Sequence, residues 1–296
     1  MHGSNKILLF SSLWNSNQSL QTFRSSALSR IIISHQSGTH GVYSQLCLKP
    51  STLHYTSTKL RAKFNDMSDS TNNNIKQQKQ LLRKKIRSRI RSAYPSSSSS
   101  TTSEADVITT KAALSSNSNK VFQRLFRLPQ YKSASSIGFF LSMPHGEIQT
   151  RQAIQQMVID GKTLYVPRVG LDFELCDMDL ICCEEGATPD GSLFYDNWPK
   201  NKWGIPEPPI TNTKSAYPGD IDLLIVPGLA FDSSLHRLGQ GKGYYDRFIA
   251  KMNTGVGKKM SLVGVCLEEQ FLEEETIPIS DHDFIMDMVL TPSKQV

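Results

Sequence analysis

The sequence lacks the features that mark membrane proteins and disulfide-stabilised proteins. Its 296 residues contain no uninterrupted apolar run near the length that a membrane-spanning helix needs, so we expect a soluble protein with no membrane partner. Cysteine is scarce, with five residues, an odd number, and no CxxC pair. A disulfide framework or a structural zinc site is therefore not expected, and a reducing compartment fits this usage. The cysteines are Cys47, Cys176, Cys182, Cys183 and Cys266.

Acidic residues are absent from the first 65 positions. Of the chain's 33 Lys and Arg, seven fall in this stretch, so 26 basic residues face 27 acidic ones in the rest. The net charge of +6 therefore belongs to the leader, and the near-neutral body argues against nucleic-acid binding. A leader rich in Ser, Thr, Asn and Gln, with scattered arginines, is typical of organelle transit peptides, although a tail without function is the alternative.

We therefore predict that residues 1–66 are a disordered transit peptide. The favoured destination is the mitochondrion rather than a plastid. Met67 is a candidate second start, which would give a cytosolic form without the leader.

The body that follows, residues 67–296, begins with helical spacing. Three apolar residues recur at intervals of four before Pro95, which predicts a helix over about 75–93. They are Leu82, Ile86 and Ile90. Basic residues at the same interval form a parallel stripe, because residues four apart lie on one helix face. This stripe consists of Lys79, Arg83 and Arg87.

A serine-rich segment follows this helix. We assign residues 96–118 to a low-complexity insertion, in which the run "SSSSSTTSE" is expected to be flexible. A second helix is expected through "KVFQRLFRL", ending before Pro129.

Short apolar runs then alternate with helical spacing. The segment "TRQAIQQMVIDG" predicts a helix with Thr150 as its N-cap and Gly161 beyond its end. The predicted strands are "SSIGFFLSM", "TLYVPRV", "DLLIVPG", "SLVGVCL" and "FIMDMVL". This order predicts an α/β fold with a mostly parallel sheet and helices on both faces. Binding sites in such folds gather at the carboxyl ends of strands.

The segment "RLGQGKGYYDRF", residues 237–248, is the strongest candidate for a binding loop. Its three glycines allow positive φ and close approach to a ligand. A helix starting near Tyr244 would direct free N–H groups at an anion, and Arg237 and Lys242 add positive charge. The spacing matches neither GxxxxGK[ST] nor GxGxxG, and a structural turn is the alternative.

The longer segment "PGLAFDSSLHRLGQGKGYYDRF" resembles the signature of the 5-formyltetrahydrofolate cyclo-ligase family, also called methenyltetrahydrofolate synthetases. Other segments resemble this family in the expected order: "KQLLR", "FFLSMPHGEIQT", "VPRV", "WGIPEP" and "IPISDHDFIMDMVLTP". The resemblance covers about residues 75–292. One departure is Leu235, where the family usually has glycine, so the loop must turn there without the freedom of glycine.

This resemblance implies a single catalytic domain that converts 5-formyltetrahydrofolate to 5,10-methenyltetrahydrofolate, with ATP and Mg²⁺ as cofactors and with release of ADP and phosphate. ATP would phosphorylate the formyl oxygen, N10 of the folate would attack the activated carbon, and phosphate would leave. Phosphoryl transfer requires positioning and neutralised charge rather than covalent chemistry from the protein. A monomer that acts on this small molecule is expected.

The resemblance also implies roles for individual residues. Lys242 and Arg237 would be catalytic, and Asp246 and Asp283 would hold Mg²⁺, a cation that prefers oxygen ligands. ATP would be bound by Lys79, Arg83, Arg237, Leu238, Gly239, Gln240, Gly241, Lys242, Gly243, Tyr244 and Tyr245. The folate would be bound by Leu141, Glu147, Gln240, Gly241, Lys242, Gly243 and Tyr244.

Without the family motif, several of these residues have simpler interpretations. Asp246 fits an ordinary residue in the first turn of a helix, and Asp283 fits a loop carboxylate. Glu147 fits a charge near a helix N-terminus. Trp203 could pack on the pterin ring, but a position in the hydrophobic core is favoured.

Two other classes of protein remain as alternatives. A sugar-phosphate isomerase or CoA-transferase-like enzyme could share the fold and the glycine-rich anion loop, but it would not need the paired aspartates. A nucleic-acid-binding module could use the basic stretch 76–91, and its affinity would fall steeply with salt.

Overall fold

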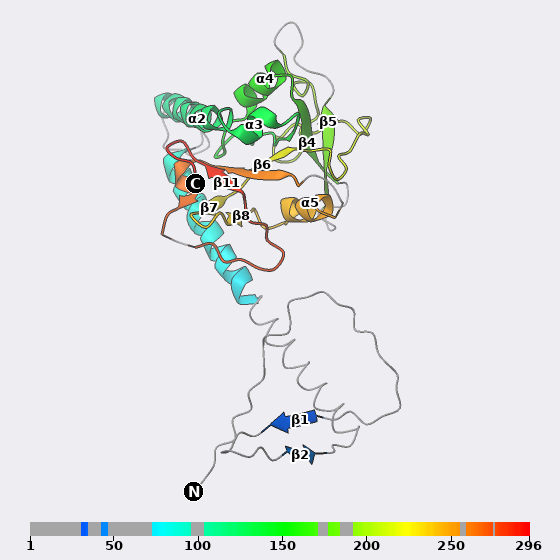
Figure 1. The fold of residues 1–296 in the computed structure, drawn as a ribbon. Coiled ribbons are helices and arrows are strands. Elements are labelled where there is room, and N and C mark those ends of the chain that lie inside the picture. Colours follow the sequence, from blue (N-terminus) through cyan, green and yellow to red (C-terminus); the bar gives the residue numbers. More distant parts are fainter. Residues whose placement is uncertain are drawn as a thin grey trace. The chain divides into compact units, whose positions relative to one another are not determined.

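The computed structural model describes residues 31–34, 43–46, 73–95, 104–170, 177–183, 192–254, 259–274 and 276–296. The chain divides into two units, Met1–Asp66 and Met67–Val296. The described part of the first unit is an antiparallel pair of strands, β1 (Ile31–Ser34) and β2 (Tyr43–Leu46) (Figure 1). Strand structure replaces the expected disorder at these positions. The rest of the predicted transit peptide lies outside the described residues.

The second unit is built on a mixed six-stranded sheet. Its strands, in spatial order, are β11 (Met288–Leu290), β9 (Ser261–Val265), β6 (Leu223–Pro227), β3 (Ser136–Gly138), β4 (Thr163–Val169) and β5 (Met178–Cys183). All neighbours are parallel except β4 and β5. The five apolar runs named above each contain a strand of this sheet, which confirms the mostly parallel α/β fold. The antiparallel strand β5 was not predicted.

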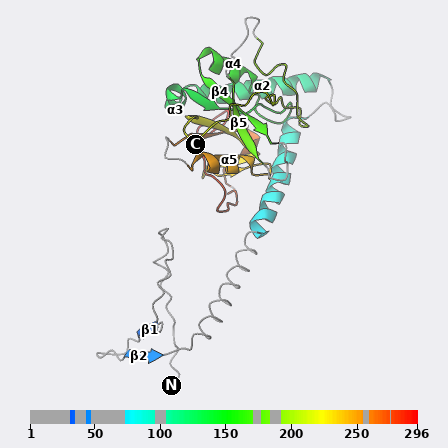
Figure 2. The ribbon, with the colours of Figure 1, turned by 90° about the vertical axis from the view of Figure 1, so that its right-hand side faces the viewer.

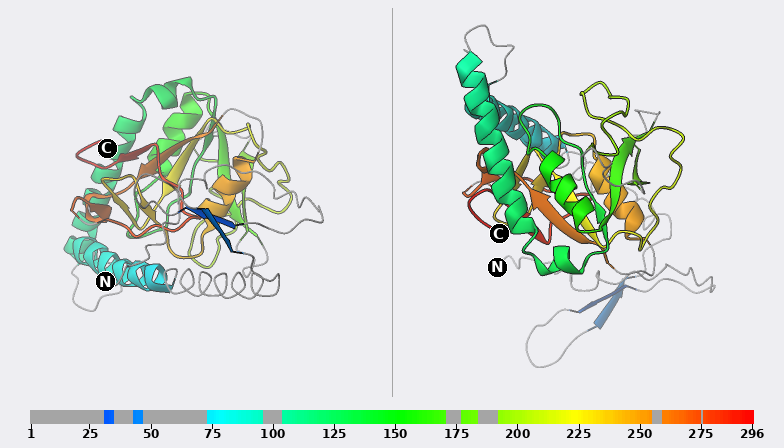
Figure 3. Two further views of the ribbon diagram at one scale, coloured as in Figure 1. Left: turned by 60° about the horizontal axis from the view of Figure 1, so that its bottom comes forward. Right: turned by 90° about the horizontal axis from the view of Figure 1, so that it is seen from above.

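Helices cover both faces of the sheet. On one face lie α2 (Glu104–Leu125), α3 (Pro129–Ser133) and α4 (Arg151–Ile159), and on the other lies α5 (Tyr244–Met252) (Figure 2). The right-hand view of Figure 3 looks onto the first face, with the green helices nearest the viewer. Each face has its own apolar core, and burial of this surface is the main force that holds the layers together.

The predicted first helix is present as residues 73–93, which we call the basic helix. Its apolar stripe packs into the core, with Ile86 fully buried and Ile90 nearly so. The face that carries Lys79 and Arg83 is left to line a pocket. Among the described residues, no helix is both long enough and apolar enough to cross a bilayer.

Part of the expected low-complexity insertion is helical. Helix α2 begins at Glu104, so residues 104–118 of the predicted insertion are helical. Leu114 and Ser118 are buried, and the Ser118 hydroxyl accepts a hydrogen bond from the backbone N–H of Gln149 at 2.9 Å. Local composition suggested a flexible segment, but packing against the body orders it. Residues 96–103 lie outside the described residues.

The helix predicted at Thr150 is α4, but its cap differs from the expectation. The Thr150 hydroxyl does not cap the helix; it accepts a hydrogen bond from the backbone N–H of Ser142 at 3.0 Å. It therefore ties the segment after β3 to the start of α4. Gly161 follows the helix with φ of 69°, as its position predicts.

A small second sheet holds the glycine-rich loop. Its strands are β7 (Ala230–Asp232), which is central, β8 (Arg237–Leu238) and β10 (Phe271–Leu272). Leu235, in the turn between β7 and β8, has a φ of 65°, so this residue takes the left-handed conformation despite its side chain. Its carbonyl accepts a hydrogen bond from the Met286 N–H at 3.0 Å. The turn is thereby connected to the segment that carries Asp283.

Candidate active site

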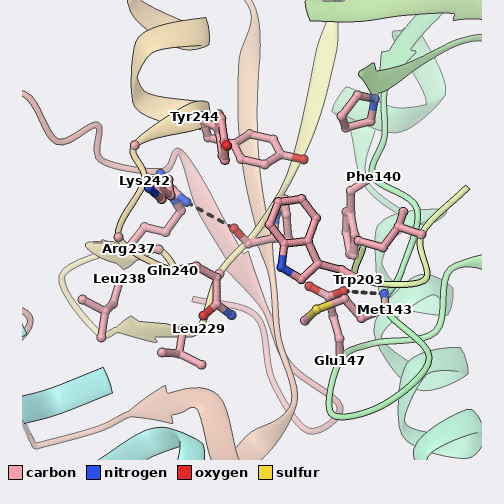
Figure 4. A pocket seen from close by; sticks show the side chains of 18 of the residues that line it. Phe140, Met143, Glu147, Trp203, Leu229, Arg237, Leu238, Gln240, Lys242 and Tyr244 are labelled. Carbon is pink, nitrogen blue, oxygen red and sulfur yellow. Dashed lines mark hydrogen bonds between the residues drawn. The ribbon is translucent and has the colours of Figure 1, made fainter. Parts of the chain in front are cut away.

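A pocket of about 850 Å³ opens at the carboxyl ends of the parallel strands. Its walls include Phe140 and Leu141 after β3, Val169 at the end of β4, and Gly228 and Leu229 after β6. This is the edge at which an open α/β sheet places its ligands. The basic helix, the glycine-rich loop and the segment around Glu147 complete the lining (Figure 4).

The glycine-rich loop takes conformations that only glycine adopts easily. Gly241 and Gly243 have φ of 108° and 69°, and Gly243 is the N-cap of α5. A left-handed N-cap points the first N–H groups of the helix toward the loop, where an anion is stabilised by the helix dipole. Lys242, between the two glycines, is exposed on the pocket wall. These features favour an anion-binding loop over a plain structural turn.

Arg237 is anchored rather than free. Its side chain is buried, and its guanidinium donates hydrogen bonds to Asp246 Oδ2 at 2.8 Å and to the Pro227 carbonyl at 3.3 Å. The guanidinium also lies over the ring of Tyr245, 5.6 Å from the ring centroid. Arg237 therefore fixes the position of the Asp246 carboxylate on the pocket wall.

Lys79 of the basic helix forms an ion pair with Asp283. The same Asp283 oxygen accepts hydrogen bonds from the backbone N–H of Ser280 at 2.6 Å and from its hydroxyl at 2.9 Å. Burial pushes the pKa of Asp283 upward, but the hydrogen bonds from Lys79 and Ser280 outweigh burial and hold this pKa below its ordinary value. Asp283 is therefore a carboxylate at neutral pH.

The basic helix also holds the glycine-rich loop directly. Arg83 Nε donates a hydrogen bond to the Gly239 carbonyl at 2.8 Å, and Arg87 donates one to the side-chain oxygen of Gln240 at 2.7 Å. Burial and the neighbouring charge of Arg87 lower the pKa of Arg83 from its ordinary value, but an arginine stays protonated at neutral pH. These cations are placed beside the loop before any ligand arrives.

Glu147 lies at the opposite side of the pocket, in the segment after β3. One of its carboxylate oxygens accepts a hydrogen bond from the Met143 N–H at 2.9 Å, an interaction drawn in Figure 4. Burial nevertheless raises the pKa of Glu147 to about 7. The Glu147 charge in turn adds to the effect of burial in raising the pKa of Tyr245. Glu147 can therefore present either a protonated or an ionised carboxyl group near neutral pH.

Trp203 does not belong to the core, contrary to the favoured interpretation. Trp203 is 40% exposed. Figure 4 shows its indole in the pocket, between Glu147 and the loop that carries Gln240 and Lys242. Gly204, with φ of 78°, turns the chain at this point. Trp203 is therefore placed to cover a flat ring by stacking.

The structure brings every predicted site residue to this single pocket. The pocket lining includes Lys79, Arg83, Leu141, Glu147, Arg237, Leu238, Gly239, Gln240, Gly241, Lys242, Gly243, Tyr244, Tyr245, Asp246 and Asp283. Residues of the same lining that sequence reasoning left without a role include Arg87, Arg91, Phe140 and Glu207. Of these residues, only the two arginines could have been predicted from the sequence, because they continue the four-residue interval of Lys79 and Arg83 on one helix face.

Comparison with known proteins agrees with this geometry. The model of the 5-formyltetrahydrofolate cyclo-ligase family matches residues 75–292, which is most of the chain. The chain belongs to this family. It is 32% identical over 191 residues to a probable 5-formyltetrahydrofolate cyclo-ligase of Schizosaccharomyces pombe, over 62% of this chain and 87% of that one. It is 30% identical to the 5-formyltetrahydrofolate cyclo-ligase of Mus musculus, over 57% of this chain and 78% of that one.

A solved structure supports the fold of this cyclo-ligase family member. The NMR structure of Aquifex aeolicus 5,10-methenyltetrahydrofolate synthetase superposes with a TM-score of 0.52 at 27% identity, over 73% of this chain and 91% of that one. A further relative, the mitochondrial 5-formyltetrahydrofolate cyclo-ligase of Arabidopsis thaliana, is 40% identical over 77 residues, or 25% of this chain and 28% of that one.

The described residues provide carboxylates for a cation but no complete metal cage. No group of three or more His, Cys, Asp or Glu side chains suited to a metal occurs within the described ranges. Asp246 and Asp283 both line the pocket beside the loop. Mg²⁺ is commonly bound by one or two carboxylates together with substrate phosphates and water. Two carboxylates on one pocket wall fit such a site.

Proposed function

We propose that the protein converts 5-formyltetrahydrofolate to 5,10-methenyltetrahydrofolate in a reaction that consumes ATP, requires Mg²⁺ and releases ADP and phosphate. The observation that supports this most strongly is the convergence of all the motif residues on one pocket at the carboxyl ends of the strands. Family membership supports the same activity. No feature of the pocket favours an isomerase or a CoA-transferase.

The charges in the pocket suit an anionic nucleotide. The lining carries six basic side chains, Lys79, Arg83, Arg87, Arg91, Arg237 and Lys242, against four carboxylates, Glu147, Glu207, Asp246 and Asp283. Two of the basic side chains are neutralised by ion pairs with Asp246 and Asp283. The others leave an excess of positive charge, which attracts anionic ligands to the pocket.

In the proposed reaction, the formyl oxygen attacks the γ-phosphorus and the bond from this phosphorus to the bridging oxygen of ADP breaks. N10 then forms a bond to the formyl carbon and loses its proton, and the carbon–oxygen bond breaks as phosphate leaves. Lys242 and the N–H groups at the start of α5 would stabilise the charge on the transferred group. Arg237 would act through Asp246, which it holds in place.

Mg²⁺ would neutralise phosphate charge and would be held by Asp246 and Asp283. Binding of the ion would compete with the present contacts of these carboxylates to Arg237 and Lys79. The two cations released from the carboxylates would then be available to phosphate oxygens. In the structure each of these carboxylates is paired with a cation, which offsets the repulsion between two like charges on one pocket wall.

The folate would lie toward Glu147, Leu141 and Trp203. The indole of Trp203 offers a face for the flat pteridine ring, and Glu147 offers a carboxyl group that can donate or accept a hydrogen bond. In this proposal the folate and the triphosphate would meet at the loop segment Gln240–Tyr244, where the formyl oxygen can reach the γ-phosphorus.

A coupled assay tests the proposal. Purified residues 67–296 with 5-formyltetrahydrofolate, ATP and Mg²⁺ should develop the absorbance of the methenyl product, and omission of either ATP or Mg²⁺ should prevent it. Asp246→Asn should lower turnover by about 100-fold or more, because the amide keeps the shape but not the charge that the cation needs. Product formation without ATP, or none in the complete mixture, would contradict the proposal.

We further propose that residues 1–66 deliver the protein to the mitochondrion. The leader contains no acidic residue before Asp66, and the Arabidopsis relative is described as mitochondrial.

A further inference from the structure

The basic helix carries more cations into the pocket than the proposed triphosphate site uses. Lys79, Arg83, Arg87 and Arg91 follow one another at intervals of four residues, and all four line the pocket. At a rise of 1.5 Å per residue, the stripe runs for about 18 Å along the helix. The first two were assigned to phosphate binding, which leaves Arg87 and Arg91 without a ligand.

Contacts along this helix show which part of the pocket each turn faces. Lys79 meets Asp283, and Arg83 meets the Gly239 carbonyl, so the N-terminal half lies against the anion loop. At the other end, Ile90 lies beside Gly146, where an added Cβ would come within 3.3 Å of the Ile90 side chain. The turn of Ile90 therefore lies beside the segment that carries Glu147, whereas Arg87, one turn earlier, still contacts Gln240 of the loop.

Arg87 and Arg91 are available to an incoming anion. Both side chains are exposed at the pocket wall. The hydrogen bond of Arg87 goes to Gln240, an uncharged amide, so its positive charge is not neutralised. Within the part of the chain that the structure describes, Arg91 makes no ion pair. Each guanidinium presents a planar fork of N–H donors that binds a carboxylate, and the two groups lie one helix turn apart.

We propose that Arg87 and Arg91 form a binding site for the carboxylates of the substrate's glutamate tail. This inference rests on the proposed function, since it takes a folate as the substrate. A folate carries its flat pteridine ring at one end and a glutamate with two carboxylates at the other. With the ring at Glu147 and Trp203, the tail leaves the pocket past the exposed C-terminal half of the basic helix. These two arginines are then specificity-determining residues for the acidic tail.

The site also predicts how further acidic residues on the tail act. Additional glutamates would extend the row of carboxylates outward along the exposed face of the basic helix, where the positive potential of its lysine and arginine side chains would attract them. Their attraction should weaken as salt rises, because exposed charges are screened over about 10 Å at 0.1 M ionic strength.

The experiment compares two substrates with matched variants of residues 67–296. One substrate is 5-formyltetrahydrofolate, and the other is 5-formyltetrahydropteroate, which lacks the glutamate. In the unaltered protein, kcat/KM should be higher for the substrate with the tail. Arg87→Gln and Arg91→Gln should each raise the KM for 5-formyltetrahydrofolate by about three- to tenfold, close to the upper range of a solvent-exposed ion pair. Arg91→Gln should leave the KM for the tail-less substrate and the KM for ATP unchanged. Arg87 also contacts Gln240 of the glycine-rich loop, so Arg91→Gln is the variant that separates the tail site from ATP binding.

Lys84→Gln is the matched control. It removes the same charge from the same helix, but Lys84 is not among the residues that line the pocket, so its kinetic constants should equal those of the unaltered protein. Equal effects of Arg91→Gln on both folate substrates, or an effect on the KM for ATP alone, would overturn the inference. Absence of activity in the unaltered protein would instead contradict the proposed function, so the two failures are distinguishable.

Discussion

Lys79 and Asp283 stand 204 positions apart in the sequence and form an ion pair on the wall of the pocket. The pair joins the first helix of the body to the segment that precedes β11. Both side chains are largely shielded, with exposed fractions of 12% and 21%. Removal of one partner leaves the other as an unpaired charge in a partly buried site.

We predict that Lys79→Gln and Asp283→Asn each lower the free energy of unfolding by about 1–2 kcal/mol, and that the double variant loses less than the sum. Because the pKa of Asp283 is lower in the folded protein than in the unfolded chain, its ionised form stabilises the fold at pH values above the ordinary carboxyl pKa. This stabilisation is lost as the pH falls through the pKa that Asp283 has in the folded protein. Urea unfolding of the four proteins at pH 7 and at pH 3 measures both effects. Additive losses, or losses unchanged at pH 3, would contradict the interaction.

Glu147→Gln should alter how stability depends on pH. The pKa of Glu147 in the folded protein, about 7, is above the ordinary value of 4.5. Between these pH values the folded protein retains a proton that the unfolded chain has released, so stability falls as pH rises through this window. The loss from this group is about 2–3 kcal/mol by pH 8, and the Gln variant should not show it.

Glu207→Gln provides the control for this measurement, because it removes another carboxylate from the same pocket. Its pH profile, followed through urea unfolding midpoints from pH 5 to pH 8, should keep the decline of the unaltered protein. A decline of the same size in Glu147→Gln would show that burial does not raise the pKa of Glu147.

Gly243→Val should abolish turnover. Gly243 has a φ of 69°, a conformation that a β-branched residue resists, and it caps the helix beside the proposed phosphate site. Gly161 shares this φ, and an added Cβ there would meet nothing within 4 Å. Gly161→Val should therefore lose stability, by about 1–2 kcal/mol, but keep its turnover. Steady-state kinetics and thermal unfolding of both variants test whether strain at Gly243 has a specific effect on the reaction.

Replacement of residues 96–103 by a Gly-Ser linker of equal length should change the melting temperature little, because a polar serine run has few apolar groups to bury. Leu114→Ala, in the helical segment that follows, should lower stability by about 2–5 kcal/mol, because Leu114 is only 6% exposed. Calorimetry of the two variants separates the linker from the helix. A large loss from the linker replacement would show that residues 96–103 pack against the body.

Fusion of residues 1–66 to a fluorescent protein should direct it to mitochondria, because an acid-free, arginine-containing leader has the composition of a transit peptide. A fusion that begins at Met67 should remain in the cytosol. Fluorescence microscopy with a mitochondrial marker reads the result. Cytosolic fluorescence of the longer fusion, or a plastid pattern in plant cells, would contradict the proposal.

The sequence predicted the central elements because their signals are local. The apolar runs of β3, β4, β6 and β9 stand out against polar flanks, and the four-residue interval marks the basic helix. Strand β5 (Met178–Cys183) was missed because no clear turn signal precedes it in the sequence. It pairs with β4 in the antiparallel direction. Helix α2 is longer than predicted. Leu114 and Ser118 are buried in the body, and these tertiary contacts, which the local sequence does not reveal, order a weakly helical segment.

For the site, the family motif identified the residues that gather in the pocket, but it gave no account of their pairing. The partners of Arg237 and Lys79 lie in other segments, at Asp246 and Asp283, and no spacing rule connects them. Trp203 was placed in the core by hydrophobicity alone, although the turn at Gly204 leaves it exposed. Leu235 departs from the family motif, which usually has glycine there, and its backbone nevertheless takes a φ of 65°.

The connection between the basic helix and the segment of Asp283 has a consequence for biosynthesis. Ribosomes make the chain from its N-terminus, so the cations of the basic helix emerge first and Asp283 emerges near the end. Ile86 and Ile90 belong to the same apolar core as Leu290 of β11, so this core is complete only after β11 has been made. Nascent chains that stop short of Asp283 should therefore lack this ion pair, and the wall of the pocket that it forms should be completed only after Asp283 has left the ribosome.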